Sequence, residues 1–424
     1  MKYYILLAIL SMATLSCKSQ VEKKQSKNEI LNLIYEFCPT ADVLEIEKKS
    51  DNYVEIEYLC NEKVVEVGIV DNKVIYQETE ADKSDVPYAK IIHKIEKKYP
   101  SWILDEINQV TANGETFLKV EIVKGGIEQN LFFTTEGKRY QANSIIISDK
   151  WNAEMLASSP VFTQANYSFL KPDAYYEMPD LLREVSGIAM LNSENMLCVQ
   201  DELGIVFKYN LKTEYTENFH RFTDKGDFED IALSGDTVHV LRSDGAVFSF
   251  DRNNKQNSKQ TALSVASLNV EGLFYNANDN YMYLVSKESE VFKNEKEAHR
   301  PVYRYRNDGQ YTLETYFEIN TKAINQSLYD NHPSLKKQDV QFNPSAIAIH
   351  PKTQSFFVLS ANDRLLAVYD SNNQLAEVYP LPAELYYKPE GLAFGTDGTL
   401  FISNEGDKIG LIKGNILAFR YVVN

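Results

Sequence analysis

One short strand recurs five times in the second half of this chain, and this repetition constrains the fold more than any other feature. The copies read SGIA, EDIA, EGLF, SAIA and EGLA, and they begin at Ser186, Glu229, Glu271, Ser345 and Glu390. They follow one another at intervals of about 42–45 residues, apart from one interval of about 74 residues. Repeats of roughly 40–50 residues are typical of the four-stranded blades of a β-propeller. The sequence therefore predicts a mainly β fold, with a five-bladed β-propeller over residues 169–424.

Each copy continues with a second strand that ends in polar residues, then a third strand and an outer fourth strand. The long interval holds an insertion, residues 320–340, with helical character. The last copy reaches the end of the chain without a fourth strand. We expect the segment Ala174–Met178, upstream of the first copy, to supply it. Such closure would remove the free edges that an open sheet must otherwise protect.

The first half of the chain has a different rhythm. Helical spacing around residues 30–38 and again around residues 91–99 is each time stopped by a proline. Two alternating strands follow each helix, over residues 53–58 and 64–70 in the first copy and over 117–122 and 128–133 in the second. Such a copy is typical of an α+β module, a helix packed on a small antiparallel sheet. The predicted organisation is a signal peptide and lipobox over residues 1–17, a tether over 18–27, a tandem α+β domain over 28–150, and a linker over 151–168 before the propeller.

The N-terminus reads as an export signal. Lys2 precedes a mostly apolar stretch, and small residues lead to Cys17. The residues Thr14-Leu15-Ser16-Cys17 resemble a bacterial lipobox, in which a peptidase cuts before an acylated cysteine. This resemblance implies a lipid anchor at Cys17 and attachment to the bacterial cell envelope, with the outer membrane favoured. Export also permits disulfides, and Cys38 and Cys60 either pair or stay as buried thiols.

Charge and hydropathy argue against nucleic-acid binding and against a membrane-spanning helix beyond the N-terminus. The chain has 44 Lys and Arg residues against 60 Asp and Glu residues, a net charge of −16, which repels a phosphate backbone. Nucleic-acid binding is therefore excluded. Mean hydropathy is −0.36, and no long apolar run follows the N-terminal one, so we expect no membrane-spanning helix downstream.

Two family resemblances follow from these segments. The stretch from VPYAKIIHKIEKKYP to FLKVEIVKGGIEQNLFFTTEGK is similar to the PepSY-like family, whose fold resembles β-lactamase-inhibitor modules. That resemblance implies protein binding or folding assistance. The phrases EVSGIA, GDFEDIA, NVEGLFYN, PSAIAIHP and KPEGLAFGTDGTLFISNEG resemble the SdiA-regulated family of exported bacterial proteins. This second resemblance implies five blades, a bound calcium ion and a distant relation to NHL-repeat propellers.

The recurring phrase also predicts a site. The first strand of each blade lines the central channel of a propeller, so equivalent positions form a ring. We expect that ring to supply metal ligands from Ser186, Glu229, Glu271, Ser345 and Glu390. The second strand is antiparallel to the first, so its polar end reaches the same rim. The rim would add Asp201, Asp244, Lys287, Asn362 and Glu405. By the period of two, the residues two positions before the ring face the same side: Glu184, Asp227, Asn269, Asn343 and Lys388.

Crowded carboxylates repel one another and raise each other's pKa values unless a cation neutralises them. Calcium takes about 6–8 hard oxygen ligands, and histidine does not recur in the repeated phrase, so calcium is the predicted cofactor. An alternative stays open, in which these glutamates bond backbone amides at the blade junctions and bind no metal.

The sequence favours a binding function over catalysis. It contains no HExxH, GxSxG, P-loop or GxGxxG motif. The leading hypothesis is an envelope protein whose propeller binds a protein or a small-molecule ligand. The alternative is a calcium-dependent hydrolase of the lactonase, esterase or phosphoesterase type, with Glu229, Glu271 or Glu390 as base. A third possibility is a scaffold that makes its contacts through large loops. His350 precedes Pro351 and is interpreted as a turn residue.

Overall fold

A computed structural model of the chain describes residues 30–48, 53–70, 72–124, 127–140, 151, 153–255, 258–263, 269–287, 299–309, 311–332, 340–407 and 410–423. The chain divides into two compact units, Met1–Val123 with Leu131–Asn143, and Lys124–Asn130 with Ser144–Asn424. The predicted signal peptide, tether and lipidated Cys17 lie outside the described residues. No helix within the described ranges is long and apolar enough to cross a membrane.

The first unit is built on one antiparallel sheet of seven strands in sequence order. The strands are β1 (Asp42–Lys48), β2 (Tyr53–Cys60), β3 (Lys63–Val70), β4 (Lys73–Glu80), β5 (Ile103–Ala112), β6 (Glu115–Lys124) and β7 (Ile127–Thr134). The sequence predicted two strands in each copy, and the structure adds β1, β4 and β5. Pairing of β4 with β5 joins the two copies into a continuous sheet.

A helix covers each half of this sheet with its apolar side. Residues 30–37 are helical, and Ile34 packs on Ile56 and Val67. In the second half, Ile91 and Ile95 of α2 (Tyr88–Lys98) pack in a core with residues of β5, β6 and β7. Two separate cores result, one under each helix, as expected for a tandem module.

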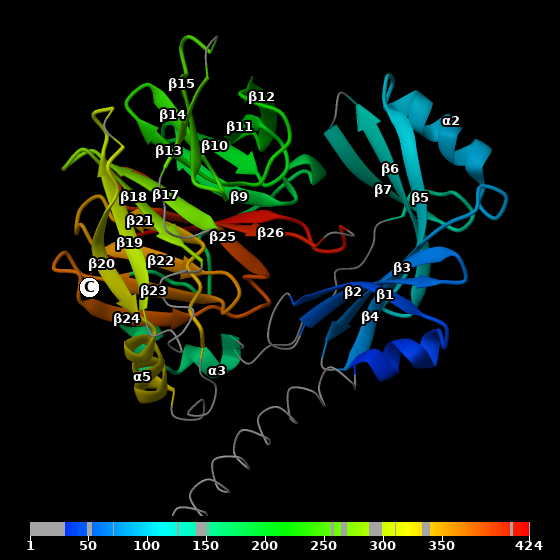
Figure 1. The fold of residues 1–424 in the computed structure, drawn as a ribbon, viewed down its shortest axis with the longest axis horizontal. Helices are drawn as coiled ribbons and strands as arrows, with labels where there is room; N and C mark the ends of the chain where they lie inside the picture. The colour runs from blue at the N-terminus through cyan, green and yellow to red at the C-terminus, as the bar shows by residue number, and fades with distance from the viewer. Residues whose placement is uncertain are drawn as a thin grey trace, which may run out of the picture. The chain divides into compact units, whose positions relative to one another are not determined.

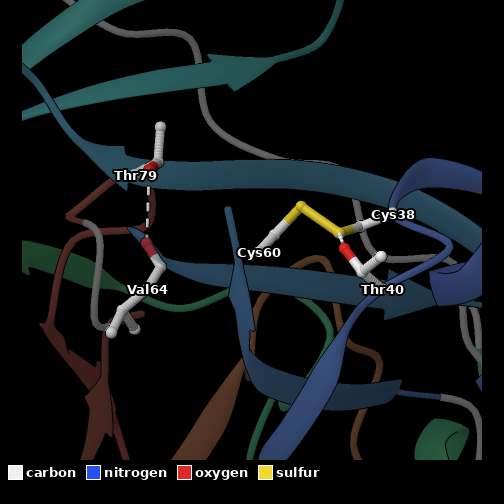
Figure 2. The surroundings of a disulfide bond; sticks show 5 residues. All are labelled: Cys38, Thr40, Cys60, Val64 and Thr79. Atoms are coloured by element: carbon white, nitrogen blue, oxygen red, sulfur yellow. Dashed lines mark hydrogen bonds between the residues drawn. A yellow bond between two sulfur atoms is a disulfide. The ribbon is translucent and has the colours of Figure 1, made fainter. Parts of the chain in front are cut away.

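A disulfide joins Cys38, just after the first helix, to Cys60 at the end of β2, with 6.2 Å between the Cα atoms. Figure 2 shows this bond beside Thr40, whose hydroxyl lies 3.5 Å from Cys38 Sγ. Of the two alternatives that the sequence left open, the structure contains the disulfide. The bond ties the first helix to the sheet that it covers.

The second unit is a five-bladed β-propeller, as predicted (Figure 1). The inner strands of successive blades contact one another in the order β9, β13, β17, β21 and β25, and β25 contacts β9 again, which closes the ring. The first two blades are β9 (Val185–Met190), β10 (Asn195–Gln200), β11 (Ile205–Asn210) and β12 (Tyr215–Arg221), then β13 (Phe228–Ser234), β14 (Thr237–Arg242), β15 (Ala246–Asp251) and β16 (Lys259–Ala262). The next two are β17 (Val270–Asn276), β18 (Tyr281–Ser286), β19 (His299–Arg306) and β20 (Glu314–Asn320), then β21 (Ala346–Ile349), β22 (Phe356–Ser360), β23 (Leu365–Tyr369) and β24 (Leu375–Pro380).

The last blade draws its strands from both ends of the unit. It contains β25 (Lys388–Phe394), β26 (Leu400–Glu405), β27 (Asn415–Phe419) and, as the outer strand, β8 (Ala174–Glu177). Strand β8 pairs antiparallel with β27, with Tyr176 opposite Ile416. The predicted closure is confirmed. The hydrophobic cores lie between neighbouring blades, because each core combines buried residues from two adjacent sheets.

Small residues follow the ring position in most blades because the inner strands pass very close to one another. A Cβ on Gly187 would lie 2.4 Å from Asp230 Cα, and one on Gly391 would lie 2.3 Å from the carbonyl oxygen of Ser186. A Cβ on Gly272 would lie 2.9 Å from the backbone nitrogen of Ile347. The recurring glycine of the sequence repeat is therefore a steric requirement of the channel.

The propeller unit also contains short helices. The segment predicted as a linker contains α3 (Ala153–Ala157) and α4 (Pro160–Thr163), and η1 (Asp180–Leu182) precedes β9. Trp151 is buried, and its indole nitrogen donates to the carbonyl of Asp363 over 3.1 Å. The insertion after β20 forms α5 (Thr321–Asn331), which packs on β24. Its residues 333–339 lie outside the described ranges.

Candidate ligand-binding mouth of the propeller channel

The three glutamates of the predicted ring occupy irregular positions at the start of their strands. Pairing with the second strand of the blade shifts register at Phe228/Asp230, at Val270/Gly272 and at Pro389/Gly391. Glu229, Glu271 and Glu390 are the residues left between these pairs. A β-bulge of this kind leaves one residue unpaired, bends the strand and re-aims the side chain. The same local device thus sets the direction of all three carboxylates.

These carboxylates gather with other charged groups around two lysines. Lys388 Nζ lies 2.5 Å from Glu405 Oε2 and 3.2 Å from Glu390 Oε1. Lys287 Nζ lies 3.4 Å from Glu271 Oε2. Electrostatic interactions of Glu229 with Glu271 and of Asp201 with Glu405 connect the remaining members. We call this group the mouth cluster, and it consists of Asp201, Glu229, Glu271, Lys287, Lys388, Glu390 and Glu405.

Burial and mutual repulsion raise the pKa values of Asp201, Glu229, Glu271 and Glu405. Burial, with added repulsion from the carboxylates of Glu271, Asp227 and Glu390, raises the pKa of Glu229 to about 11. Burial likewise raises the pKa of Glu271 to about 7, although Lys287 opposes the change. Burial raises the pKa of Glu405 to about 7 against the effect of Lys388. At neutral pH Glu229 is therefore protonated, while Glu271 and Glu405 are near the midpoint of titration.

The two lysines stay charged for the opposite reason. Burial lowers the pKa of Lys388, but the carboxylates of Glu405 and Glu390 outweigh this effect and raise it well above its ordinary value. Glu271 and Glu390 do the same for Lys287. The mouth cluster thus holds five acidic groups around two ammonium groups. Protons on some of the acidic groups reduce the excess of negative charge.

Asp201 has an orphaned oxygen. Its Oδ1 atom is buried and has no hydrogen-bond partner in the described part of the chain. Burial and the charges of Glu405 and Glu184 raise the pKa of Asp201 well above its ordinary value. An unsatisfied buried carboxylate oxygen is costly, and such atoms are frequently explained by an ion, a water or a ligand.

The two serines of the predicted ring are buried and bonded to backbone. Ser186 Oγ donates to the carbonyl of Glu184 over 3.3 Å. Ser345 Oγ lies 3.3 Å from the carbonyl oxygen of Pro389, in the next blade. The Ser186 hydroxyl therefore bonds within its own segment of chain, whereas the Ser345 hydroxyl reaches the next blade.

Two members of the predicted rim stand outside the cluster. Asp244 is exposed and forms a two-pronged ion pair with Arg242 of its own blade, at 2.9 and 2.8 Å, which lowers the pKa of Asp244. Asn362 is half-buried, and its neighbour Asp363 accepts instead from Ser360 Oγ. The residues two positions before the ring do not all enter the cluster. Asp227 and Asn269 are exposed, whereas Lys388 enters the cluster.

A blade-junction carboxylate does exist, but one residue after the ring. Asp230 is buried, its Oδ1 accepts from its neighbour Ile231 N over 2.8 Å, and its Oδ2 accepts from Leu273 N in the next blade over 2.7 Å. The sequence analysis assigned this role, as an alternative, to the ring glutamates. Only blade two carries an aspartate where three of the other blades have glycine. This departure from the repeat is the sequence feature that could have identified Asp230 as the junction residue.

Apolar side chains line the channel farther along the inner strands. A cavity of about 120 Å³ lies farther along the inner strands and is lined by residues such as Ile188, Ile231, Leu273 and Leu392. These residues stand two positions after the ring in four of the blades. The mouth cluster therefore lies at one end of a channel whose next residues are apolar. A polar ligand would enter from the charged end.

His350 has a structural role, in agreement with the sequence analysis. Its Nδ1 accepts from the backbone nitrogens of Lys352 and Thr353 at 3.1 and 3.0 Å. Burial lowers its pKa. The histidine thus organises the turn after β21.

The comparisons with known proteins find similarities among solved structures. No protein-family model matches the chain, and no curated protein matches it. Among solved structures, it is similar to the PQQ-bound aldose sugar dehydrogenase of Streptomyces coelicolor (13% identity, TM-score 0.41, 59% of this chain and 97% of that chain). Others are the glutaminyl cyclase of Myxococcus xanthus (13%, 0.40, 60% and 97%) and a gluconolactonase from Xanthomonas campestris (13%, 0.37, 57% and 77%).

The chain is a five-bladed β-propeller protein with an additional sheet unit. Identities and TM-scores this low carry no argument about function. The resemblances to the SdiA-regulated and PepSY-like families stay predictions.

Proposed function

We propose that this chain is a bacterial envelope protein, exported and lipid-anchored through Cys17, whose propeller binds a ligand at the mouth cluster. The observation that carries the proposal is the cluster itself. Five buried or partly buried acidic groups surround two lysines at one end of a channel with an apolar lining. Buried charges of this density cost stability, and functional sites are where such groups concentrate.

The excess of acid over base favours a positively charged ligand. Once they lose their protons, five acidic groups outweigh two ammonium groups and favour a cation, or the cationic part of a protein or small molecule. Because Glu229 is protonated at neutral pH, and Glu271 and Glu405 are partly so, cation binding would release protons. Affinity would then increase as pH increases.

Calcium is the cation that the sequence predicts, and its fit is mixed. The donor chemistry suits it, because the oxygens are hard and Asp201 Oδ1 is orphaned. The arrangement does not, because ammonium groups sit between the carboxylates. Among the described residues, no group of three or more His, Cys, Asp or Glu side chains is placed to hold a metal ion. Calcium binding stays a prediction, and the proposed function does not depend on it.

A calcium titration by calorimetry, together with thermal unfolding in calcium and in chelator, tests the ion. If calcium binds at the mouth, Glu271→Ala should lower the melting temperature more in calcium than in chelator, where only the pairing with Lys287 is lost. The matched control is Asp244→Asn, which removes a carboxylate outside the cluster. Equal losses for Glu271→Ala in both buffers would count against a metal role and leave organic cations as the ligand class.

The hydrolase alternative rests on one specific observation. The pKa values of Glu271 and Glu405, about 7, lie in the range suited to a general base. Assaying lactone, aryl ester and phosphoester panels with calcium and with chelator distinguishes the two functions. Turnover that chelator abolishes and Glu271→Gln reduces would favour the enzyme, whereas saturable binding without turnover would favour the binding protein.

A further inference from the structure

The sheet unit contains a hollow of its own. It has a volume of about 440 Å³ and lies between the C-terminal half of α2 and the last strand, β7. The lining residues are Lys94, Ile95, Lys97, Lys98, Tyr99, Leu131, Phe133 and Arg139. Small-molecule sites typically measure about 300–1,000 Å³, so this hollow is large enough for a compact ligand.

Its floor is apolar and belongs to the core of the unit. Ile95, Leu131 and Phe133 are each at most 2% exposed and pack together beneath α2. The partly buried ring of Tyr99 adds a side wall. A ligand seated here would therefore place an apolar part against these side chains.

The rim is cationic and partly fixed in place. Lys94 Nζ donates to the carbonyl of Gly137 over 2.8 Å, which ties α2 to the turn before Arg139. The guanidinium carbon of Arg139 lies 5.2 Å from the ring centre of Phe133, and Lys98 Nζ lies 5.6 Å from that of Tyr99. Both cations thus stand over aromatic rings that line the hollow.

These cations have no acidic partner of their own. In the part of the chain that the structure describes, none of Lys94, Lys97, Lys98 and Arg139 forms an ion pair with a carboxylate. The protein as a whole carries a net charge of −16. Four unpaired cations around one apolar hollow therefore depart from the general charge of the surface, and they complement an anion.

We propose that this hollow binds an anionic amphiphile, a molecule with an acyl chain and one acidic head group. The chain would lie over Ile95, Leu131 and Phe133. The head group would meet Arg139 and the lysines of α2, since guanidinium pairs with carboxylate or phosphate through two parallel hydrogen bonds.

Calorimetric titration of the purified protein with dodecanoate, below its micelle concentration, tests this site. Dodecanoate is expected to bind with one-to-one stoichiometry. Octanoate should bind more weakly, by about fourfold for each missing methylene group. Dodecyltrimethylammonium, which has the same chain and a positive head, should not bind at the site. Equal binding of the two twelve-carbon amphiphiles, or several weak sites for dodecanoate, would overturn the proposal.

Matched variants locate the site. Arg139→Gln should weaken dodecanoate binding about tenfold, the usual scale of a lost charge-assisted hydrogen bond. Lys73→Gln removes one exposed positive charge from β4, outside the hollow, and should leave affinity within about twofold. Equal effects of the two variants would mean that dodecanoate is attracted by the overall charge of the unit and not by this hollow, which would overturn the proposal. Binding of an extended acidic peptide in place of dodecanoate would instead make β7 a strand-pairing edge, which contradicts an acyl site.

Discussion

Both units of this chain repeat a small β-motif, but only the propeller closes its repeat on itself. In the propeller, β25 returns to β9, so equivalent residues from distant parts of the sequence reach a common axis. In the sheet unit the two copies are joined in a line from β1 to β7, and each keeps its own core. Closure therefore creates a shared site, whereas linear repetition creates edges and a local hollow.

The two units also differ in the bonds that join distant parts of their chains. The propeller pairs β8 with β27, which joins the two ends of its ring by backbone hydrogen bonds. The sheet unit uses the covalent bond between Cys38 and Cys60. This difference follows from geometry, because a linear sheet has no partner strand to close with. Each of these connections is open to a separate test.

The largest effect is expected from blocking the closure of the ring. Gly391→Val places a side chain where even a Cβ would lie 2.3 Å from the Ser186 carbonyl oxygen, between the last blade and the first. Backbone must move to admit it, so we expect a loss of more than about 3 kcal/mol in the free energy of unfolding of the propeller. Urea unfolding followed by circular dichroism measures it.

The control for this variant is Gly235→Ala, in a turn where nothing lies within 4 Å of the added Cβ but φ is +61°. Backbone strain alone should cost about 1 kcal/mol there. Similar losses for the two variants would mean that close contact between inner strands does not limit the stability of the ring.

Removing the disulfide should have the next largest effect, confined to the sheet unit. Cys38 and Cys60 are separated by 22 positions, and cross-links closing loops of this size typically contribute about 2–4 kcal/mol. We expect Cys38→Ala/Cys60→Ala to lower the melting transition of the sheet unit and to leave that of the propeller unchanged. Dithiothreitol should reproduce the shift in the wild type and have no effect on the double variant. A shift of the propeller transition would show that the units unfold together.

Much of the difference between the closed propeller and the linear sheet unit could be predicted from the sequence. The recurrence of SGIA, EDIA, EGLF, SAIA and EGLA specified five blades, and the missing fourth strand after Leu417 specified closure by residues near Tyr175. Hydrophobic repetition carries this information because every blade must bury the same two faces. The strand count of the sheet unit was harder, since β1 and β5 lie where apolar and charged residues alternate weakly.

The site was predictable only in part. Position in the repeat located Glu229, Glu271 and Glu390 at the channel mouth. Strand periodicity could not show that each occupies a bulge, because one extra residue changes which neighbours share its side. It also could not show that Arg242 holds Asp244 away in its own blade, or that Lys388 pairs with two of the acids. These pairings lie within single blades, and they depend on how far each side chain reaches and in which direction.

A pH dependence separates the mouth from the rest of the propeller. The pKa of Glu229 is raised to about 11 in the folded chain, against an ordinary value of 4.5. The folded state therefore holds a proton that the unfolded state releases above pH 4.5, and stability contributed by this proton falls as pH increases between these values. Glu229→Gln keeps the neutral form, so it should stabilise the protein by at least about 1 kcal/mol at pH 8, the scale of one pKa unit, and have little effect at pH 4. Thermal melts across this range measure the difference, and a pH-independent effect would contradict a titrating Glu229.

The smallest effect is expected at the predicted rim residue that stands outside the cluster. Asp244 is exposed and pairs with Arg242, and exposed ion pairs contribute about 0–1 kcal/mol. Asp244→Asn should therefore change the free energy of unfolding by less than about 0.5 kcal/mol at neutral pH, with a further decrease of the effect at high salt, because salt screens an exposed pair. Glu405→Gln, at the equivalent end of the second strand in the last blade, removes a buried partner of Lys388 and should show almost no salt dependence. If Asp244→Asn altered ligand binding at the mouth as strongly as Glu405→Gln, the boundary drawn around the mouth cluster would be wrong, and equivalence in the repeat would predict the site better than ion pairing does.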